Sequence, residues 1–217
     1  LHNLCGMNEL QARALMCEVG KRLWQKDLVG GAEGNISVRL SSRQILCTPS
    51  GVSKGHLRPA DLVVIDNHGN STTEAKPSSE IRLHLKILAN RKDCQAVIHA
   101  HPPIATAFAL AGEDIPDNLL PECAFVLGSV ATVPFGEPGT EDLPNKIEPL
   151  LDDHKTFLLA NHGAVVMGTD LLDALYRMET LERVARLILN ARLLGQPQPM
   201  PDAYFKKLIK LALHGKF

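Results

Sequence analysis

Three histidines lie in sequence contexts that are typical of metal ligands. His99 and His101 are two residues apart in an apolar run, 96–101, that predicts a strand, so both imidazoles project from the same face. Two prolines follow and end the strand, which predicts that the pair lies at a sheet edge where a pocket can open. His162 lies in an Asn-His-Gly turn between two apolar strands. A structural role is the alternative for each, but three histidines and a vacant position match a catalytic zinc site.

Glu80 is the candidate for proton transfer. It follows Lys-Pro-Ser-Ser, a sequence that predicts a helix start with Ser78 or Ser79 as the N-cap and Glu80 in the first turn. A glutamate in this position often only complements the helix dipole. Beside a metal it can instead move protons on and off carbon. The two serine hydroxyls and the free N–H groups of the helix start form a ready anion site.

Two further turns carry small polar residues that could contact a ligand. Gly34 and Asn35 belong to a Gly-Asn-Ile-Ser sequence, and Ser50 and Gly51 close a Thr-Pro-Ser-Gly sequence. Each alone is a common turn, but together with the two serines before Glu80 they supply hydroxyl and N–H donors for a phosphate. Neither GxxxxGK[ST] nor GxGxxG occurs, so nucleotide binding has no support in the sequence.

The composition narrows the class of protein that carries these residues. The chain has 217 residues, 23 basic and 24 acidic side chains, a net charge of −1 and 4% aromatic residues. This balance offers neither the basic face of a nucleic-acid binder nor a polybasic membrane patch. No apolar run approaches the ~20 residues that span a bilayer. Five cysteines at scattered positions predict reduced thiols and a cytoplasmic protein.

The helices and strands that position the candidate residues are predicted from the spacing of apolar residues and from capping and turn residues. Helices are expected at 8–25, from about 80, and at 104–111, 142–151, 171–194 and 202–213, with Gly195 as a left-handed cap. Strands are expected at 35–40, 44–47, 61–66, 96–101, within 125–135, and at 156–160 and 164–167. No linker or repeat interrupts the chain. These elements predict a single domain, 1–217, with a mixed, largely antiparallel sheet and helices on both faces.

The order of the motifs resembles that of the class II aldolase/adducin family. The matching sequences are Gly-Asn-x-Ser from Gly34, Thr-Pro-Ser-Gly up to Gly51, Lys-Pro-Ser-Ser-Glu up to Glu80, His-x-His and Asn-His-Gly, over about residues 8–200. The resemblance implies a three-layer α/β/α sandwich around a mostly antiparallel central sheet. It also implies a homotetramer with active sites at subunit interfaces.

The resemblance further implies a role for each matching residue. One Zn²⁺ per chain would be held by His99, His101 and His162, and by Glu80 when substrate is absent. Glu80 would transfer the proton. The phosphate of a small sugar phosphate would be surrounded by Gly34, Asn35, Ser50, Gly51, Ser78 and Ser79. The implied activity is the reversible cleavage of a ketose 1-phosphate, such as L-fuculose 1-phosphate, to dihydroxyacetone phosphate and a short aldehyde.

Some residues depart from the pattern of the fuculose-phosphate enzyme. Ala32 stands where that pattern has a threonine, and no tyrosine matches the one that a neighbouring subunit lends to protonate the aldehyde oxygen. Tyr204 or Glu122 could take that role. A pentulose-5-phosphate 4-epimerase would have aspartate in place of Glu80. A methylthioribulose-1-phosphate dehydratase, a keto-acid sugar phosphate decarboxylase and a non-catalytic adducin-like interaction domain are further alternatives, although the last has no need of three histidines and a glutamate.

Overall fold

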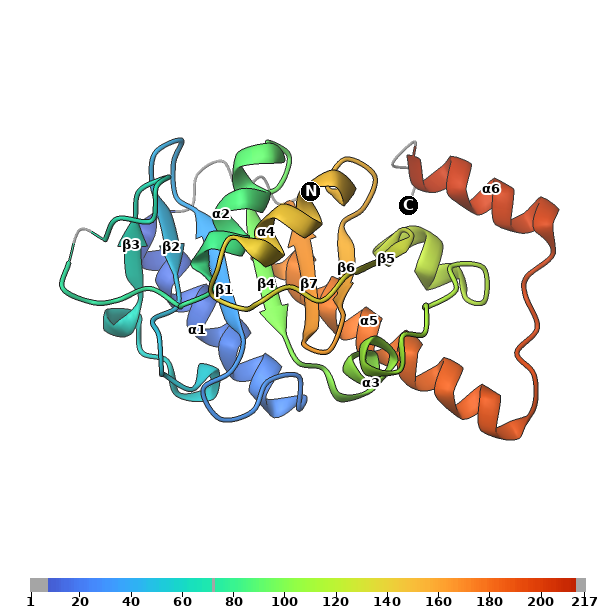
Figure 1. Ribbon diagram of the computed structural model, residues 1–217. Coiled ribbons are helices and arrows are strands. Elements are labelled where there is room, and N and C mark those ends of the chain that lie inside the picture. Colours follow the sequence, from blue (N-terminus) through green and yellow to red (C-terminus); the bar gives the residue numbers. More distant parts are fainter. Residues whose placement is uncertain (1–7, 72, 214–217) are drawn as a thin grey trace.

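A single mixed sheet of seven strands organises the molecule, in the order β3-β2-β1-β4-β7-β6-β5. The computed structural model describes residues 8–71 and 73–213 (Figure 1). The strands are β1 (Asn35–Arg39), β2 (Ile45–Cys47), β3 (Val63–Ile65), β4 (Ala96–Ala100), β5 (Val130–Val133), β6 (Thr156–Leu159) and β7 (Gly163–Gly168). Neighbouring strands are antiparallel except β5 and β6, which are parallel. The expected mostly antiparallel sheet is confirmed.

Helices cover both faces of this sheet and make the three layers of the expected sandwich (Figure 1). They are α1 (Glu9–Gln25), α2 (Ile81–Asn90), α3 (Pro103–Ala111), α4 (Asp142–Ile147), α5 (Leu171–Leu194) and α6 (Asp202–Leu213). One buried cluster joins α1, α3 and α5 to the sheet through residues such as Met16, Phe108 and Met178. A second joins α2 and α4 to the opposite face through Leu83 and Leu143.

Side-chain caps set where the two longest helices begin. At α1, the N–H of Gln11 donates to Asn8 Oδ1 at 2.9 Å and the N–H of Asn8 donates to Gln11 Oε1 at 3.1 Å, a capping box. At α5, Asp170 Oδ1 accepts from the N–H groups of Leu172 and Asp173, each at 2.8 Å. Both helices have the lengths that the apolar periodicity predicts.

The structure corrects several local expectations. The range 125–135 contains one strand, β5, as expected, but its start belongs to a π-helical turn, η3 (Cys123–Leu127), which was not expected. Glu80 is the N-cap position of α2 rather than part of its first turn, and neither preceding serine caps the helix. Gly195 has φ 161°, which is extended rather than left-handed, and its N–H still closes α5 on Ala191 O. The rest of 142–151 forms a short 3₁₀ turn, Glu148–Leu150.

Four cysteines lie in the described residues, and all four are free thiols. Cys47, Cys94 and Cys123 are buried, and Cys17 is half-buried. Burial raises the pKa of the Cys47 thiol to about 12, so this thiol is an unreactive part of the core. The fifth cysteine, at position 5, lies outside the described residues. Among the residues that the structure describes, no helix combines the length and the apolar character needed to cross a membrane.

Candidate active site

The candidate site lies where three connections meet at one end of the central strands. His99 belongs to β4 and His101 follows it directly, while His162 lies in the turn between β6 and β7. Glu80 enters at the start of α2. Strand β4 is bordered by β1 and β7, and the histidine pair lies where this central strand ends, at the edge formed by the strand ends. Strand β7 returns antiparallel beside β4, which brings His162 to the histidine pair.

The three histidines are close enough to share one ion. Ligand atoms of His99, His101 and His162 all lie within 4.8 Å of one another, and Nε2 of His99 is 3.1 Å from Nε2 of His101. His99 Nδ1 lies 2.9 Å from Ala164 O, and His101 Nδ1 lies 3.2 Å from Glu33 Oε2. These partners place a proton on Nδ1 of both rings, so the Nε2 atoms of His99 and His101 face each other.

Such a donor set suits a divalent cation. Two buried acceptor nitrogens that face each other repel unless a cation or a proton lies between them. The Nδ1 atom of His162 is buried without a hydrogen-bond partner among the described residues. Burial, followed by the charge of His99, lowers the pKa of His162 to about 4, so this imidazole is neutral near pH 7, as a metal ligand must be. The residues therefore fit a divalent metal ion with three histidine ligands.

Glu80 lies against this cluster. Its Oε2 is 3.3 Å from His99 Nε2, its Oε1 is 3.2 Å from His162 Nε2, and Asn35 Nδ2 donates to Oε2 at 2.9 Å. Burial by itself would raise the pKa of Glu80. The hydrogen bond and charge of His99, with further contributions from His162 and Asn35, outweigh burial and hold this pKa well below its usual range. The carboxyl group is thus ionised at neutral pH, the form that a general base must have.

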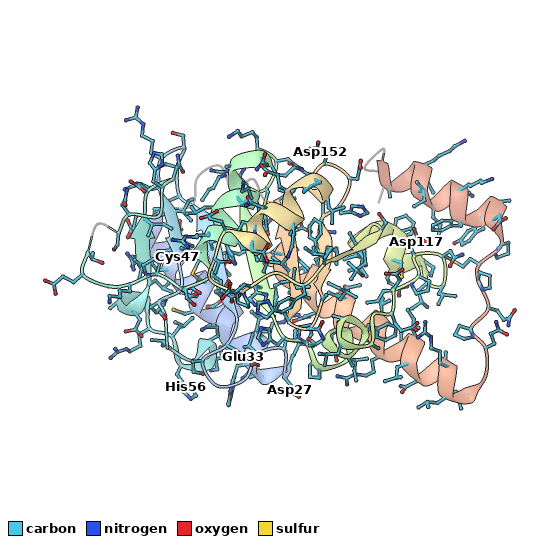
Figure 2. All side chains as sticks on the ribbon, in the orientation of Figure 1. Asp27, Glu33, Cys47, His56, Asp117 and Asp152 are labelled. Atoms are coloured by element: carbon cyan, nitrogen blue, oxygen red, sulfur yellow. The ribbon has the colours of Figure 1, made fainter. Side chains whose placement is uncertain are left out.

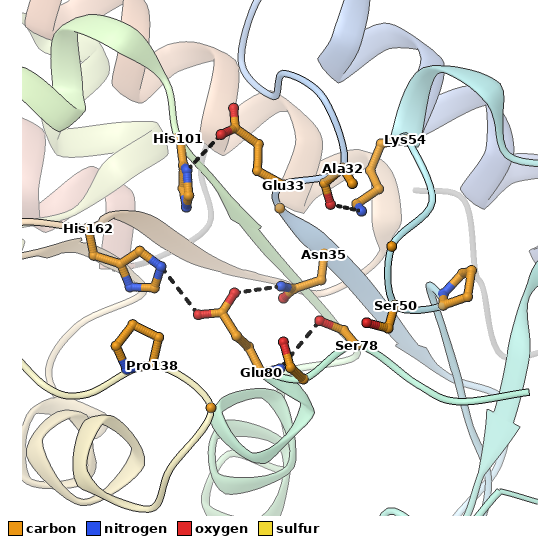
Figure 3. Close-up of a pocket in the computed structure, with 15 residues that line it drawn as sticks. Ala32, Glu33, Asn35, Ser50, Lys54, Ser78, Glu80, His101, Pro138 and His162 are labelled. Carbon is orange, nitrogen blue, oxygen red and sulfur yellow. Dashed lines mark hydrogen bonds and ion pairs between the residues drawn. The ribbon is translucent and has the colours of Figure 1, made fainter.

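A pocket of about 330 Å³ opens above Glu80. Figure 2 shows the side chains on both faces of the sheet, and Figure 3 shows the pocket itself, with His101 and His162 at one end and Ser50 and Ser78 at the other. All six candidate phosphate contacts line it: Gly34, Asn35, Ser50, Gly51, Ser78 and Ser79. Glu80 lies between the two ends. The structure thus brings residues from all five motifs around one pocket.

Three of the sequence candidates do not line this pocket. His99 is fully buried, and its Nε2 contacts Glu80, which does line the pocket. Tyr204 is on α6, which packs on η3, and Glu122 precedes η3. Neither of these two lines the pocket of its own chain.

Two charged residues of the pocket were not singled out from the sequence. Glu33, directly before Gly34, accepts from the N–H of Gly30 at 2.6 Å through Oε1, while its Oε2 faces His101. A carboxylate next to a glycine-rich ligand turn was the signal that could have indicated it. Lys54 begins a short 3₁₀ turn, η1 (Lys54–His56), and lines the pocket although its side chain is only 2% exposed. Its burial has no signal in the local sequence.

Two glycines let the loops of the site approach one another. Gly34 has φ +72°, and a Cβ there would lie 2.6 Å from Val29 Cγ1 and 3.0 Å from His99 O. A Cβ on Gly163 would lie 2.6 Å from both Ala100 O and His101 Cδ2. Any side chain at Gly163 would therefore displace the ring of His101.

Comparison with known proteins agrees with this arrangement. Residues 14–189 match the family model for the class II aldolase and adducin N-terminal domain. The chain belongs to the class II aldolase and adducin family. This membership confirms the resemblance seen in the motifs, and the sheet with its flanking helices is the fold of class II aldolases.

Members of the class II aldolase family with two different activities are similar to this chain. A 3-oxo-tetronate 4-phosphate decarboxylase of Haemophilus influenzae is 35% identical over 83% of this chain and 88% of its own length. An L-fuculose phosphate aldolase of Methanococcus maripaludis is 33% identical over 78% of this chain and 92% of its own. The structure of an L-fuculose 1-phosphate aldolase superimposes with a TM-score of 0.85 at 32% identity, covering 94% of this chain and 96% of that one.

Proposed function

We propose that this protein is a divalent-metal-dependent lyase that decarboxylates a phosphorylated 3-oxo sugar acid, of the 3-oxo-tetronate 4-phosphate type, to carbon dioxide and dihydroxyacetone phosphate. The observation that carries the proposal is the Glu80 carboxylate. It lies 3.2 Å from His162 and 3.3 Å from His99, in a pocket whose other end is lined by the hydroxyl-bearing residues Ser50, Ser78 and Ser79. One group for proton transfer, one metal site and one anion site are thus within reach of a single small substrate.

The chain's own residues supply the metal site and the proton path. His99, His101 and His162 would hold the ion, with zinc the expected metal because three histidines and an open position suit it. When bound, the metal supplies Lewis-acid stabilisation of the negative charge that develops on the substrate's ketone and hydroxyl oxygens. Glu80, ionised at rest, accepts the proton of the hydroxyl next to the ketone.

The reaction then balances with one proton consumed. The bond between the carboxylate carbon and its neighbour breaks, and its electron pair moves toward the ketone as CO₂ leaves. Glu80 returns its proton to the carbon that has lost CO₂. Water reprotonates the hydroxyl oxygen. The hydrogen bond from Asn35 keeps the carboxylate turned toward this position.

Decarboxylation is favoured over aldol cleavage because it needs fewer acid–base groups. Glu80 and water suffice for the proton transfers that accompany loss of CO₂, whereas aldol cleavage also needs a group that exchanges a proton with the oxygen of the departing aldehyde. The chain has two tyrosines, and neither Tyr176 nor Tyr204 lies in the mid-chain stretch where the aldolase pattern has the tyrosine that a neighbouring subunit lends. Cleavage of an L-fuculose 1-phosphate-like ketose phosphate is the second candidate. It uses the same metal, Glu80 and phosphate contacts, and the fuculose-phosphate aldolases among the relatives support it.

We further propose that the working form is a homotetramer in the cytoplasm, with each pocket completed by a neighbouring subunit. The pocket is open to the surface, and the resemblance to fuculose-phosphate aldolases supports this assembly. Light scattering coupled to size exclusion should give a mass about four times that of the chain, and a monomer would refute the assembly.

The function is tested by a substrate panel with direct product detection. Purified protein with about one equivalent of zinc is incubated with 3-oxo-tetronate 4-phosphates and with ketose 1-phosphates, and CO₂, dihydroxyacetone phosphate and aldehyde are measured separately. We expect CO₂ and dihydroxyacetone phosphate in equal amounts from the sugar acid, and no product after chelation. Aldehyde production from a ketose 1-phosphate as the faster reaction would favour the second candidate. Activity that survives full removal of metal would refute both.

A further inference from the structure

Lys54 is a buried cation at one end of the pocket. Its Nζ donates to Ala32 O and to Val52 O, each at 2.7 Å. Figure 3 shows this ammonium beside Ala32 and on the side of Ser50, away from His162. An ammonium has three N–H donors, so one donor is not engaged by these two carbonyl groups.

No carboxylate of the described residues forms a direct ion pair with this cation. Within the ranges 8–71 and 73–213, no carboxylate oxygen lies within 4.0 Å of Lys54 Nζ. Burial lowers its pKa to about 8, although the charges of Glu33 and Glu80, the acidic groups that face it, act in the opposite direction. A buried ammonium without a counter-charge is unfavourable. An anion bound in the pocket would remove this penalty.

The backbone at Lys54 packs closely against α1. A Cβ on Gly20 would lie 2.6 Å from Lys54 O, and a Cβ on Gly55 would lie 2.5 Å from Trp24 Cγ. The η1 turn therefore rests directly on α1, with no room for a side chain between them. Lys54 is held in the pocket wall by this contact.

We propose that Lys54 is the residue that selects a phosphate dianion. Its third N–H donates to a phosphate oxygen, and its charge compensates the dianion at the end of the pocket lined by Ser50, Gly51 and Ser78. The proposal rests on the proposed function, since it takes the substrate to be a sugar phosphate. It explains how a pocket that also contains Glu33 and Glu80 can accept two negative charges. It also predicts that the phosphorylated ligand is preferred over the neutral one because of Lys54.

The test compares two ligands that differ only in the phosphate. Binding of dihydroxyacetone phosphate and of dihydroxyacetone to the zinc-loaded protein is measured by ligand-observed NMR titration. Lys54→Met should weaken the binding of the phosphate by about 10- to 100-fold, the range expected for one hydrogen bond between charged groups, and leave dihydroxyacetone unaffected. The matched control is Lys155→Met, which removes an exposed lysine whose Nζ is 3.7 Å from Asp93 Oδ2. It should change neither affinity.

A second variant and a pH series on the unmutated protein test the role of Lys54 independently. Lys54→Gln retains an amide donor for the carbonyl groups but removes the charge, and should show the same selective loss. In the unmutated protein, the affinity for dihydroxyacetone phosphate relative to that for dihydroxyacetone should fall between about pH 7 and about pH 9.5. Lys54 loses its proton over this range, whereas the phosphate stays a dianion. Equal losses for both ligands, or a relative affinity that does not change with pH, would overturn the role of Lys54.

These outcomes are separate from a failure of the proposed function. A protein that turns over none of the panel substrates but binds dihydroxyacetone phosphate through Lys54 would refute the reaction and support the role of Lys54. If the protein is active and Lys54→Met binds dihydroxyacetone phosphate as tightly as the unmutated protein, the reaction is supported and the role of Lys54 is refuted.

Discussion

Replacing Glu33 by glutamine should weaken the metal site without touching a metal ligand. The Glu33 carboxylate accepts two hydrogen bonds, from the N–H of Gly30 at 2.6 Å and from His101 Nδ1 at 3.2 Å. A glutamine has one oxygen and one NH₂ group in these two places. The backbone N–H of Gly30 can only donate, so it keeps the amide oxygen, and the NH₂ group then faces His101 Nδ1.

The consequence is a change of tautomer at His101. With a donor in front of it, Nδ1 must become the acceptor, and the ring proton moves to Nε2, the nitrogen that faces His99 Nε2 at 3.1 Å. A protonated Nε2 cannot bind a metal. Loss of such a supporting hydrogen bond typically costs about 10- to 100-fold in metal affinity, which corresponds to about 1.4–2.7 kcal/mol.

Zinc affinity is measured by competition with a chromophoric chelator. Glu113→Gln is the matched control, since Glu113 pairs with Arg192 at 3.2 Å on the surface and makes no contact with the site. Metal-free Glu33→Gln should melt close to the unmutated protein, while the gain in stability on adding zinc should be smaller by the same 1.4–2.7 kcal/mol or so. Equal zinc affinities for Glu33→Gln and Glu113→Gln would refute the account of His101 given above.

Three other substitutions test separate parts of the structure. Glu80→Gln should keep the fold and lower turnover about 100- to 10,000-fold, as expected for loss of a general acid–base group; steady-state rates at saturating substrate check this, and a rate near that of the unmutated protein would exclude proton transfer by Glu80. Gly163→Ala should destabilise the protein by about 1–3 kcal/mol through overpacking against His101, whereas Gly195→Ala, with open space around its Cβ, should not; urea unfolding of both distinguishes a local clash from a general intolerance. Burial lowers the pKa of His84 to about 3 in the folded protein. Between about pH 6.5 and pH 3, His84 is therefore protonated in the unfolded chain but neutral in the folded one. The free energy of unfolding falls over that range as the pH is lowered, by up to about 1.4 kcal/mol per pH unit. His84→Gln should flatten that part of the stability curve of the metal-free protein, and an unchanged slope would contradict the assignment.

Much of the fold was predictable from local patterns. The starts of α1 and α5 follow from N-caps, which are short-range effects. Asn8 caps α1 together with Gln11, and Asp170 caps α5. The stretch 125–135 was less predictable. Apolar residues in this stretch suit a strand and a buried turn equally well. The first residues of the stretch form the π-helical turn η3 because they pack there against α5 and α6.

By itself, the sequence determined which side chains could do chemistry and which of them share an element. His99 and His101 are neighbours because of strand periodicity, and Ser78 and Glu80 because they lie at one helix start. Only the tertiary structure decided that His162 joins the pair, because β7 returns antiparallel beside β4. It alone also decided that Glu33 supports His101 and that Lys54 is buried in the pocket wall. The physical reason is that hydrogen bonding and burial depend on groups distant along the chain, which local sequence patterns do not contain.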